Sequence, residues 1–202
     1  MDRLPWARLI PQSQSRNTPH LIYWKQETAV RIHKSVLTPL GVFTLVSEEG
    51  ALCALFPGVP DPAVNHGLGR IVEDGFEAAE FQLSQYFAGR RCCFDLELDT
   101  GGTPFQRQVW AEVSAIPYGR TCSYKELAVR LGDAAKARSV GAALSRNPLN
   151  IIIPTHRVVG SRGSLTGYSG GIDSKRFLLE HEGSQSTAAL RTQCAAAAGV
   201  PA

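Results

Sequence analysis

The sequence lacks any hydrophobic segment long enough to cross a membrane. Its 202 residues contain no apolar run that approaches the roughly 20 residues needed to span a bilayer. Residues 1–20 also lack the apolar core of a secretory signal. With 44% hydrophobic and 19% charged residues, the composition is that of a chain that can bury a core. We therefore expect a globular protein without membrane contact.

Metal-binding patterns are also missing. The chain has five cysteines, at positions 53, 92, 93, 122 and 194, and none of them forms a CxxC pair. The five histidines do not lie at zinc-ligand spacings from these cysteines. We predict no metal site and no cofactor. An odd number of cysteines favours a reducing compartment over a disulfide-rich scaffold.

Charge is distributed unevenly along the chain. Residues 1–100 contain 9 Lys and Arg against 12 Asp and Glu, whereas residues 101–183 contain 11 against 6. A basic C-terminal half favours a polyanion as its partner. The alternative is an ordinary solvated surface on which the charges are scattered at random, and charge alone leaves both interpretations open.

The N-terminal half has the pattern of a small α+β domain. Residues 1–20 are rich in Pro, Ser, Arg and Gln without periodicity, which is typical of a flexible tail. Short apolar runs between residues 28 and 57 are separated by turn residues and predict an antiparallel meander. A helical pattern covers residues 72–88, and its apolar face consists of Phe76, Ala79, Leu83, Tyr86 and Phe87. Alternation over residues 92–98 predicts a final strand. We assign residues 21–98 to this domain.

The C-terminal half is predicted to be mostly helical. Amphipathic patterns predict helices at residues 105–115, 123–130, 134–145 and 175–181, with Ser123 and Glu126 placed for a capping box. Two helices around the turn at residues 131–133 form a helix-turn-helix arrangement. Five glycines within residues 160–171 predict a long loop. The fold class is thus α+β, with a C-terminal domain at residues 99–183 and a flexible tail at residues 184–202.

The C-terminal half also carries a series of short motifs. In chain order they are Gly102-Thr103-Pro104-Phe105-Gln106-Arg107-Gln108-Val109-Trp110, Ser123-Tyr124, Arg138-Ser139-Val140-Gly141, Asn147-Pro148, Ile153-Pro154-Thr155-His156-Arg157-Val158, Gly167-Tyr168-Ser169-Gly170-Gly171 and His181-Glu182-Gly183. Together they resemble the O6-alkylguanine-DNA alkyltransferase family, the methylated-DNA–protein-cysteine methyltransferases. The resemblance covers residues 35–183 and is dense after residue 102. Any one motif alone would be weak evidence.

The resemblance implies a catalytic group with one altered member. The family moves an alkyl group from a guanine oxygen to the cysteine of a Pro-Cys-His-Arg motif, beside a histidine base that a glutamate orients. His156 and Glu182 match the base and its orienter, but Thr155 stands at the acceptor position. An alcohol does not ionise near neutral pH, so Thr155 is expected to be a poor acceptor. The chain resembles alkyltransferase-like proteins in this respect. An inactivated version of a true transferase fits the sequence equally well.

The resemblance also implies residues that bind DNA. Residues 134–145 form a helix poor in bulky side chains, and its Ala137, Ser139 and Gly141 are expected to approach the minor groove. Arg138 resembles the arginine that replaces a rotated base, and Tyr124 the tyrosine that pushes the 3′ phosphate. The alternatives are tight helix packing for the small residues, a phosphate contact or ion pair for Arg138, and a half-buried core aromatic for Tyr124.

Further matching residues belong to the expected lesion pocket and its support. Tyr168, Ser169 and Gly170 match the loop that lines the base pocket, although an ordinary glycine-rich turn would look the same. Asn147 precedes a proline and is expected to brace the turn before Thr155. Arg157 is expected to be buried against a carboxylate and to anchor the two domains or this turn.

The sequence-based hypothesis is a DNA repair protein that binds O6-alkylguanine in double-stranded DNA by base flipping, without efficient alkyl transfer. The alternatives are a working suicide methyltransferase, a helix-turn-helix transcription factor and a Thr-His-Glu hydrolase. A transcription factor is disfavoured because the helix at 134–145 is not rich in the Arg, Asn and Gln residues that read major-groove edges. We expect a cytoplasmic monomer, nucleoid-associated if the source is bacterial, with other repair proteins as further partners.

Overall fold

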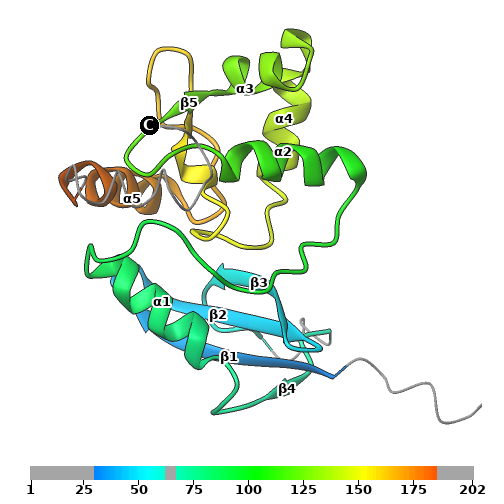
Figure 1. Ribbon diagram of the computed structural model, residues 1–202, viewed down its shortest axis with the longest axis vertical. Coiled ribbons are helices and arrows are strands. Elements are labelled where there is room, and N and C mark those ends of the chain that lie inside the picture. The colour runs from blue at the N-terminus through cyan, green and yellow to red at the C-terminus, as the bar shows by residue number, and fades with distance from the viewer. Residues whose placement is uncertain (1–29, 62–66, 186–202) are drawn as a thin grey trace, which may run out of the picture.

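The computed structural model describes residues 30–61 and 67–185. A sheet with one covering helix forms the N-terminal part, and a cluster of helices forms the C-terminal part (Figure 1). The predicted α+β class is therefore confirmed. The tails expected at residues 1–20 and 184–202 lie outside the described residues, except that the last helix continues to Gln185.

The N-terminal sheet is a meander of three antiparallel strands with one short addition. Strands β1 (Arg31–Thr38), β2 (Gly41–Glu48) and β3 (Ala51–Pro57) follow the apolar runs predicted at residues 28–57. Glu49 and Gly50 both have positive φ (51° and 89°), the conformation that a two-residue hairpin turn needs. Strand β4 (Arg70–Ile71) pairs parallel to β1, and the strand order is β3-β2-β1-β4. Nothing in the sequence pattern indicated β4.

Helix α1 (Glu77–Phe87) begins later than the helical pattern at residue 72 predicted. Gly75 has a φ of +101°, which is outside the helical region and blocks an earlier start. The helix buries Ala79, Leu83 and Tyr86 as expected. These side chains join the apolar core over the sheet.

The strand predicted at residues 92–98 is wrong. This segment is irregular, and only Leu98 forms an isolated bridge, to Leu52 of β3. The side chain of Gln82 explains the difference, because it donates to the backbone carbonyl of Asp95 (2.6 Å) and accepts from the backbone NH of Asp95 (2.8 Å). Backbone groups satisfied by a side chain are no longer available for a strand partner.

The C-terminal part contains the predicted helices in the predicted order. They are α2 (Pro104–Ser114), α3 (Tyr124–Arg130), the 3₁₀ turn η1 (Ala134–Lys136), α4 (Ala137–Leu144), the 3₁₀ turn η2 (Thr155–Arg157) and α5 (Ile172–Gln185). Two short strands, β5 (Cys122–Ser123) and β6 (Val158–Val159), pair in parallel. The capping box between Ser123 and Glu126 forms as predicted.

The helix expected at residues 134–145 forms in two pieces. It begins as η1, where the Asp133 side chain accepts a hydrogen bond from the NH of Ala135, and continues as α4. Val140 and Leu144 face the core. Trp110 of α2 donates its indole NH to the carbonyl of Ala143 (3.0 Å), which fixes α4 against α2.

The two parts meet along the free edge of β3. The NH of Leu55 donates to the carbonyl of Pro148 (2.8 Å), and the NH of Asn150 donates to the carbonyl of Leu55 (3.0 Å). This pairing places the segment before Thr155 directly against the N-terminal sheet.

Two further observations concern composition. Among the described residues, Cys53, Cys93 and Cys122 are free thiols. Cys92 is disulfide-bonded, which differs from the reduced state that the odd number of cysteines favoured. Within residues 30–61 and 67–185, no helix is long and apolar enough to cross a membrane.

Candidate functional site

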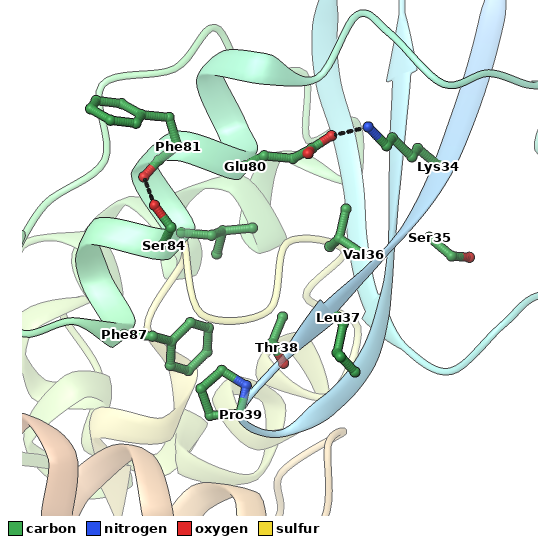
Figure 2. Close-up of a pocket in the computed structure, with 11 residues that line it drawn as sticks. Lys34, Ser35, Val36, Leu37, Thr38, Pro39, Glu80, Phe81, Ser84 and Phe87 are labelled. Carbon is green, nitrogen blue, oxygen red and sulfur yellow. Dashed lines mark hydrogen bonds and ion pairs between the residues drawn. The ribbon is translucent and has the colours of Figure 1, made fainter.

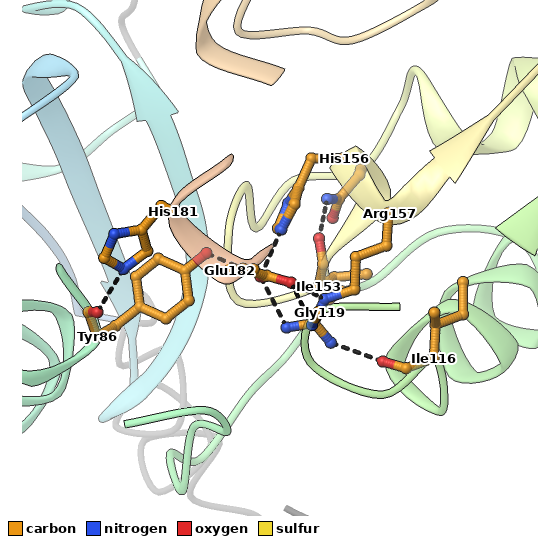
Figure 3. A network of polar contacts seen from close by, with 9 residues as sticks. Tyr86, Ile116, Gly119, Ile153, His156, Arg157, His181 and Glu182 are labelled. Carbon is orange, nitrogen blue, oxygen red and sulfur yellow. Dashed lines mark hydrogen bonds and ion pairs between the residues drawn. The ribbon is translucent and has the colours of Figure 1, made fainter. Parts of the chain in front are cut away.

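A buried carboxylate, that of Glu182 on α5, is the centre of the polar site (Figure 3). Its Oε1 accepts hydrogen bonds from Tyr86 Oη (2.9 Å), His156 Nε2 (2.8 Å) and Arg157 Nη2 (2.9 Å). Its Oε2 accepts from Arg157 Nε (2.9 Å) and the NH of Gly119 (3.0 Å). Arg157 is thus buried against a carboxylate, as expected, and it also donates to the carbonyl of Ile116.

These contacts determine which nitrogen of His156 can act as a base. Burial alone would raise the pKa of Glu182, but His156 and Arg157 outweigh it and hold the pKa of this carboxyl well below its usual range. Burial, together with the charges of Arg157 and Lys175, lowers the pKa of His156 more than Glu182 raises it, so the ring is neutral near pH 7. Since Nε2 faces a carboxylate, Nε2 carries the proton. Nδ1, which is buried without a hydrogen-bond partner among the described residues, is left as the acceptor.

Thr155 is the first residue of η2, immediately before His156, and it is 4% exposed. The nearby side chain of Asn147 shapes the turn before it. Asn147 Nδ2 donates to the carbonyls of Leu149 (3.2 Å) and Ile153 (3.0 Å), and its Oδ1 accepts from the NH of Leu149 (3.0 Å). The same Nδ2 lies 3.5 Å from the hydroxyl of Thr155. The bracing role expected for Asn147 agrees with these contacts.

The segment that leads into Thr155 is strained at Ile151. This residue is 1% exposed and has a φ of +73°, a conformation that β-branched side chains rarely adopt. Such backbone strain costs about 1–3 kcal/mol and persists only where surrounding contacts enforce it. Here the enforcing contacts are the hydrogen bonds of Asn147 and the pairing of Asn150 with β3.

The glycine-rich loop of residues 160–171 lies over this cluster. The ring of Tyr168 meets that of His156 edge-on, with 6.2 Å between their centroids. The Tyr168 hydroxyl is enclosed without a hydrogen-bond partner among the described residues, and burial raises its pKa. Gly170 has no room for a side chain, because a Cβ atom would lie 2.8 Å from Cε1 of Tyr168. Ser169 donates to the side chain of Asn150 (2.6 Å).

Tyr124 is attached to the same loop. Its hydroxyl donates to the carbonyl of Thr166 (2.9 Å), and the ammonium of Lys175 donates to that carbonyl (2.8 Å) and to the carbonyl of Val158 (2.6 Å). Lys175 is completely buried, and burial lowers its pKa to about 8. Tyr124 therefore connects α3 with the loop that carries Tyr168.

Helix α4 presents small residues at the surface. Arg138 and Ser139 are exposed, while Ala137 and Gly141 are half-buried. A Cβ atom at Gly141 would lie 3.7 Å from Cε1 of Tyr124, which is an ordinary contact distance. Packing inside the protein therefore does not require glycine at this position, which argues against tight helix packing as the reason for it.

Comparison with known proteins identifies the family. The model of the 6-O-methylguanine DNA methyltransferase ribonuclease-like domain matches residues 32–100, and the model of the DNA binding domain of the same family matches residues 104–184. The chain belongs to the 6-O-methylguanine DNA methyltransferase family. The resemblance that the sequence motifs indicated is thus confirmed.

Curated relatives of this methyltransferase family cover most of the chain. The methylated-DNA–protein-cysteine methyltransferase of Mycobacterium tuberculosis is 42% identical over 160 residues, which are 78% of this chain and 96% of the relative. The protein of the same name from Methanosarcina acetivorans is 47% identical over 154 residues, 73% of this chain and 95% of the relative.

Solved structures in the methyltransferase family share this fold. The M. tuberculosis O6-methylguanine methyltransferase superimposes with a TM-score of 0.71 at 42% identity, covering 78% of this chain and 96% of that one. A structure described as M. tuberculosis OGT in complex with DNA gives 0.69 at 42% identity, covering 79% and 98%.

The structure brings most of the predicted site residues together. The contiguous group consists of Thr155, His156, Glu182, Asn147, Arg157, Tyr168, Ser169 and Gly170. Tyr124 and Gly141 lie beside each other at its border, and Arg138 projects from the surface of α4. Their functional roles remain predictions. Sequence reasoning missed Asn150 and Lys175 as polar members of the site, and it placed Tyr86 only as a core residue.

A pocket on the N-terminal part shares none of these residues. It lies between β1 and α1, where Lys34 and Glu80 form an ion pair and the apolar side chains of Leu37, Phe81 and Phe87 surround it (Figure 2). Among the described residues, no group of three or more His, Cys, Asp or Glu side chains could hold a metal ion.

Proposed function

We propose that this chain recognises O6-alkylguanine in double-stranded DNA by rotating the damaged base out of the helix, and that it does not transfer the alkyl group efficiently. One observation carries the proposal. A neutral His156, oriented by Glu182, stands next to Thr155, at the position that the motif resemblance assigns to the acceptor cysteine, in a chain whose relatives are named protein-cysteine methyltransferases. The residues that bind the lesion would thus be retained, while the residue that accepts the alkyl group is replaced.

The chemistry of the acceptor supports the absence of transfer. A thiolate is a soft nucleophile and forms near neutral pH, whereas a threonine hydroxyl stays protonated. Activated hydroxyl nucleophiles succeed on carbonyl carbons, where an oxyanion hole stabilises the intermediate. In alkyl transfer, the hydroxyl oxygen of Thr155 would have to attack an sp³ carbon, and this reaction has no such intermediate. His156 as a base would not remove this barrier.

The surface of the C-terminal part supports DNA as the partner. Exposed Arg138 and Ser139 lie on a helix whose small residues allow close approach to a groove. Tyr124, at the border of this helix, is tied to the loop carrying Tyr168. In this proposal Arg138 fills the gap left by the rotated base, and Tyr168 to Gly170 enclose the base. The structure of a 42% identical relative in complex with DNA supports the same partner.

The decisive experiment compares matched duplexes with and without a single O6-methylguanine. Affinity is measured at low and physiological salt, and the intact mass of the protein is then determined. We expect tighter binding to the lesion duplex, weaker binding to both as salt rises, and no mass gain. Equal affinity for the two duplexes, or affinity unaffected by salt, would contradict the proposal.

A second candidate is a suicide methyltransferase that uses Thr155 or a displaced cysteine. The complete His156–Glu182 pair favours it, since lesion binding alone does not need a base. A gain of one methyl mass would establish this candidate and remove the first.

The proposal includes an organisation and a setting for the chain. Residues 21–98 would form an N-terminal domain and residues 99–183 the DNA-binding domain. The protein would act as a monomer in the cytoplasm, on the nucleoid if the source is bacterial, and other repair proteins would process the lesion it marks.

A further inference from the structure

We propose that Tyr86, a residue of the N-terminal part, is a positioning residue for His156 that acts through the carboxylate of Glu182. The inference concerns the site of the proposed function and rests on it for its purpose. It assigns the N-terminal part a direct share in that site.

The contacts of Tyr86 are those of a site residue. Tyr86 lies in the last turn of α1 and is completely buried. Its hydroxyl donates to Glu182 Oε1 (2.9 Å), the same oxygen that accepts the Nε2 proton of His156 (2.8 Å). Its backbone carbonyl lies 2.8 Å from Nε2 of His181. Helix α1 is therefore connected to two consecutive residues of α5, and one of them is the carboxylate that orients His156 (Figure 3).

Sharing one oxygen has an electrostatic consequence. Each donor to Oε1 draws on the same negative charge, so the hydroxyl of Tyr86 reduces the charge that His156 experiences. It also holds Oε1 toward His156 together with Nη2 of Arg157, while Nε of Arg157 and the NH of Gly119 hold Oε2. Without the hydroxyl, Glu182 would stabilise a protonated His156 more strongly. Tyr86 thereby helps to keep His156 neutral and its Nδ1 free to accept a proton.

Within the described part of the chain, five other charged or titratable side chains face this pair. They are Arg157 on η2, Lys175 and His181 on α5, Tyr118 after α2 and Tyr168 in the glycine-rich loop. Tyr118 offers a matched control, because its ring packs edge-on to that of Tyr86 with 6.1 Å between centroids. Its hydroxyl is also buried but has no hydrogen-bond partner among the described residues.

The test compares Tyr86→Phe with Tyr118→Phe in the otherwise unchanged chain. Each variant loses one buried hydroxyl, and only the first loses a hydrogen bond to Glu182. The titration of His156 is followed through its ring nitrogen chemical shifts in ¹⁵N-histidine-labelled protein. We expect the titration midpoint of His156 to rise by about 0.5–1 pH unit in Tyr86→Phe. We expect no change in Tyr118→Phe. Equal midpoints in the wild-type protein and Tyr86→Phe would overturn the proposal, as would equal shifts in both variants.

A second measurement on the wild-type protein covers the case in which Tyr86→Phe does not fold. Two protons that share Glu182 Oε1 lie close together, so the hydroxyl proton of Tyr86 should give a nuclear Overhauser effect to the Nε2 proton of His156. Its absence, with both protons observed, would refute the shared oxygen. Neither measurement uses DNA. A failure of lesion binding would therefore sink the proposed function and leave the assignment of Tyr86 to be decided by these spectra alone.

Discussion

Ser169 donates a 2.6 Å hydrogen bond to the side-chain oxygen of Asn150. The amide nitrogen of the same Asn150 donates to the carbonyl of Leu55 in β3 (3.1 Å). One buried amide thus connects the N-terminal sheet with the loop predicted to enclose the flipped base. The backbone NH of Asn150 also donates to the carbonyl of Leu55, and this pairing supports the strained Ile151 that follows it.

This connection predicts coupling between the two side chains in lesion recognition. Asn150→Ala should reduce the preference for O6-methylguanine duplex over unmodified duplex by about 3- to 10-fold, the value of one buried hydrogen bond. Ser169→Ala should reduce it by the same amount or less, because Asn150→Ala also removes the hydrogen bond to Leu55. The double variant should lose no more than Asn150→Ala alone, because the contact that Ser169→Ala removes is already absent in that variant. Additive losses in this double-mutant cycle would show that the two residues act separately.

Thr155→Cys should create alkyl transfer. The variant places a thiol beside His156, a setting that lowers the pKa of a cysteine. It also removes one buried methyl group, which should lower the free energy of unfolding by about 1 kcal/mol. Intact mass after incubation with methylated duplex should rise by one methyl per protein and then stop, since nothing regenerates the thioether. Thr155→Ser is the matched control and should take up nothing. A folded, lesion-binding cysteine variant without uptake would show that His156 and Glu182 do not serve as a proton relay.

Arg138→Ala should weaken binding to lesion duplex more than binding to unmodified duplex. Rotating a base out of the duplex costs unstacking energy on the order of a few kcal/mol. In the proposed complex, contacts made by Arg138 in the vacated space offset part of this cost. Arg90→Ala removes the same charge from an exposed position in the N-terminal part and serves as the control. If Arg138→Ala lowers both affinities equally, Arg138 is a phosphate contact instead.

Gly141→Ala separates DNA approach from internal packing. A methyl group fits beside Tyr124 at ordinary contact distance, and alanine favours helix over glycine by about 0.5–1 kcal/mol. Thermal unfolding should therefore occur at an unchanged or higher temperature. Affinity for both duplexes should fall, because the added methyl group keeps α4 away from the groove. A stable variant with undiminished DNA affinity would remove α4 from the interface.

Lys175 should make stability rise with pH in the mildly alkaline range. Burial lowers its pKa to about 8 from an ordinary value of 10.5. Between these values the unfolded chain binds more protons than the folded one, so the free energy of unfolding increases with pH. Urea unfolding between pH 8 and 9.5 should show this slope in the wild-type protein and a smaller one in Lys175→Met. Parallel curves would mean that Lys175 keeps its proton throughout.

Local patterns predicted the elements whose signals lie within a few residues. The meander, the order of the helices and the capping box of Ser123 and Glu126 all depend on short-range periodicity and turn chemistry. The strand at residues 92–98 was wrong because its backbone is satisfied by Gln82, a residue on a different element. Apolar and polar residues do alternate in this segment, but the side chain of Gln82 forms the backbone hydrogen bonds of Asp95 that a neighbouring strand would otherwise form.

The same limit applies to the candidate site. His156, Arg157 and Thr155 are adjacent in the sequence, and their motif could be recognised there. The hydroxyl of Tyr86 reaches a carboxylate 96 positions away, and Asn150 reaches Leu55 across 95. Helical periodicity placed Tyr86 correctly in the core, but burial says nothing about which partner a hydroxyl group finds. Such pairings depend on how the two parts pack.

The pairing of β3 with segments of the C-terminal part also covers one edge of the N-terminal sheet. Leu52 and Leu55 lie on an edge strand, and their backbone groups are satisfied by residues 97–99 and 148–150. At the opposite edge, β4 has only two residues and offers little to pair with. An exposed β3 would be a template on which strands of other molecules could add. Residues 148–150, which lead into the candidate site, thus also occupy backbone groups of β3 that strands of other molecules could otherwise pair with.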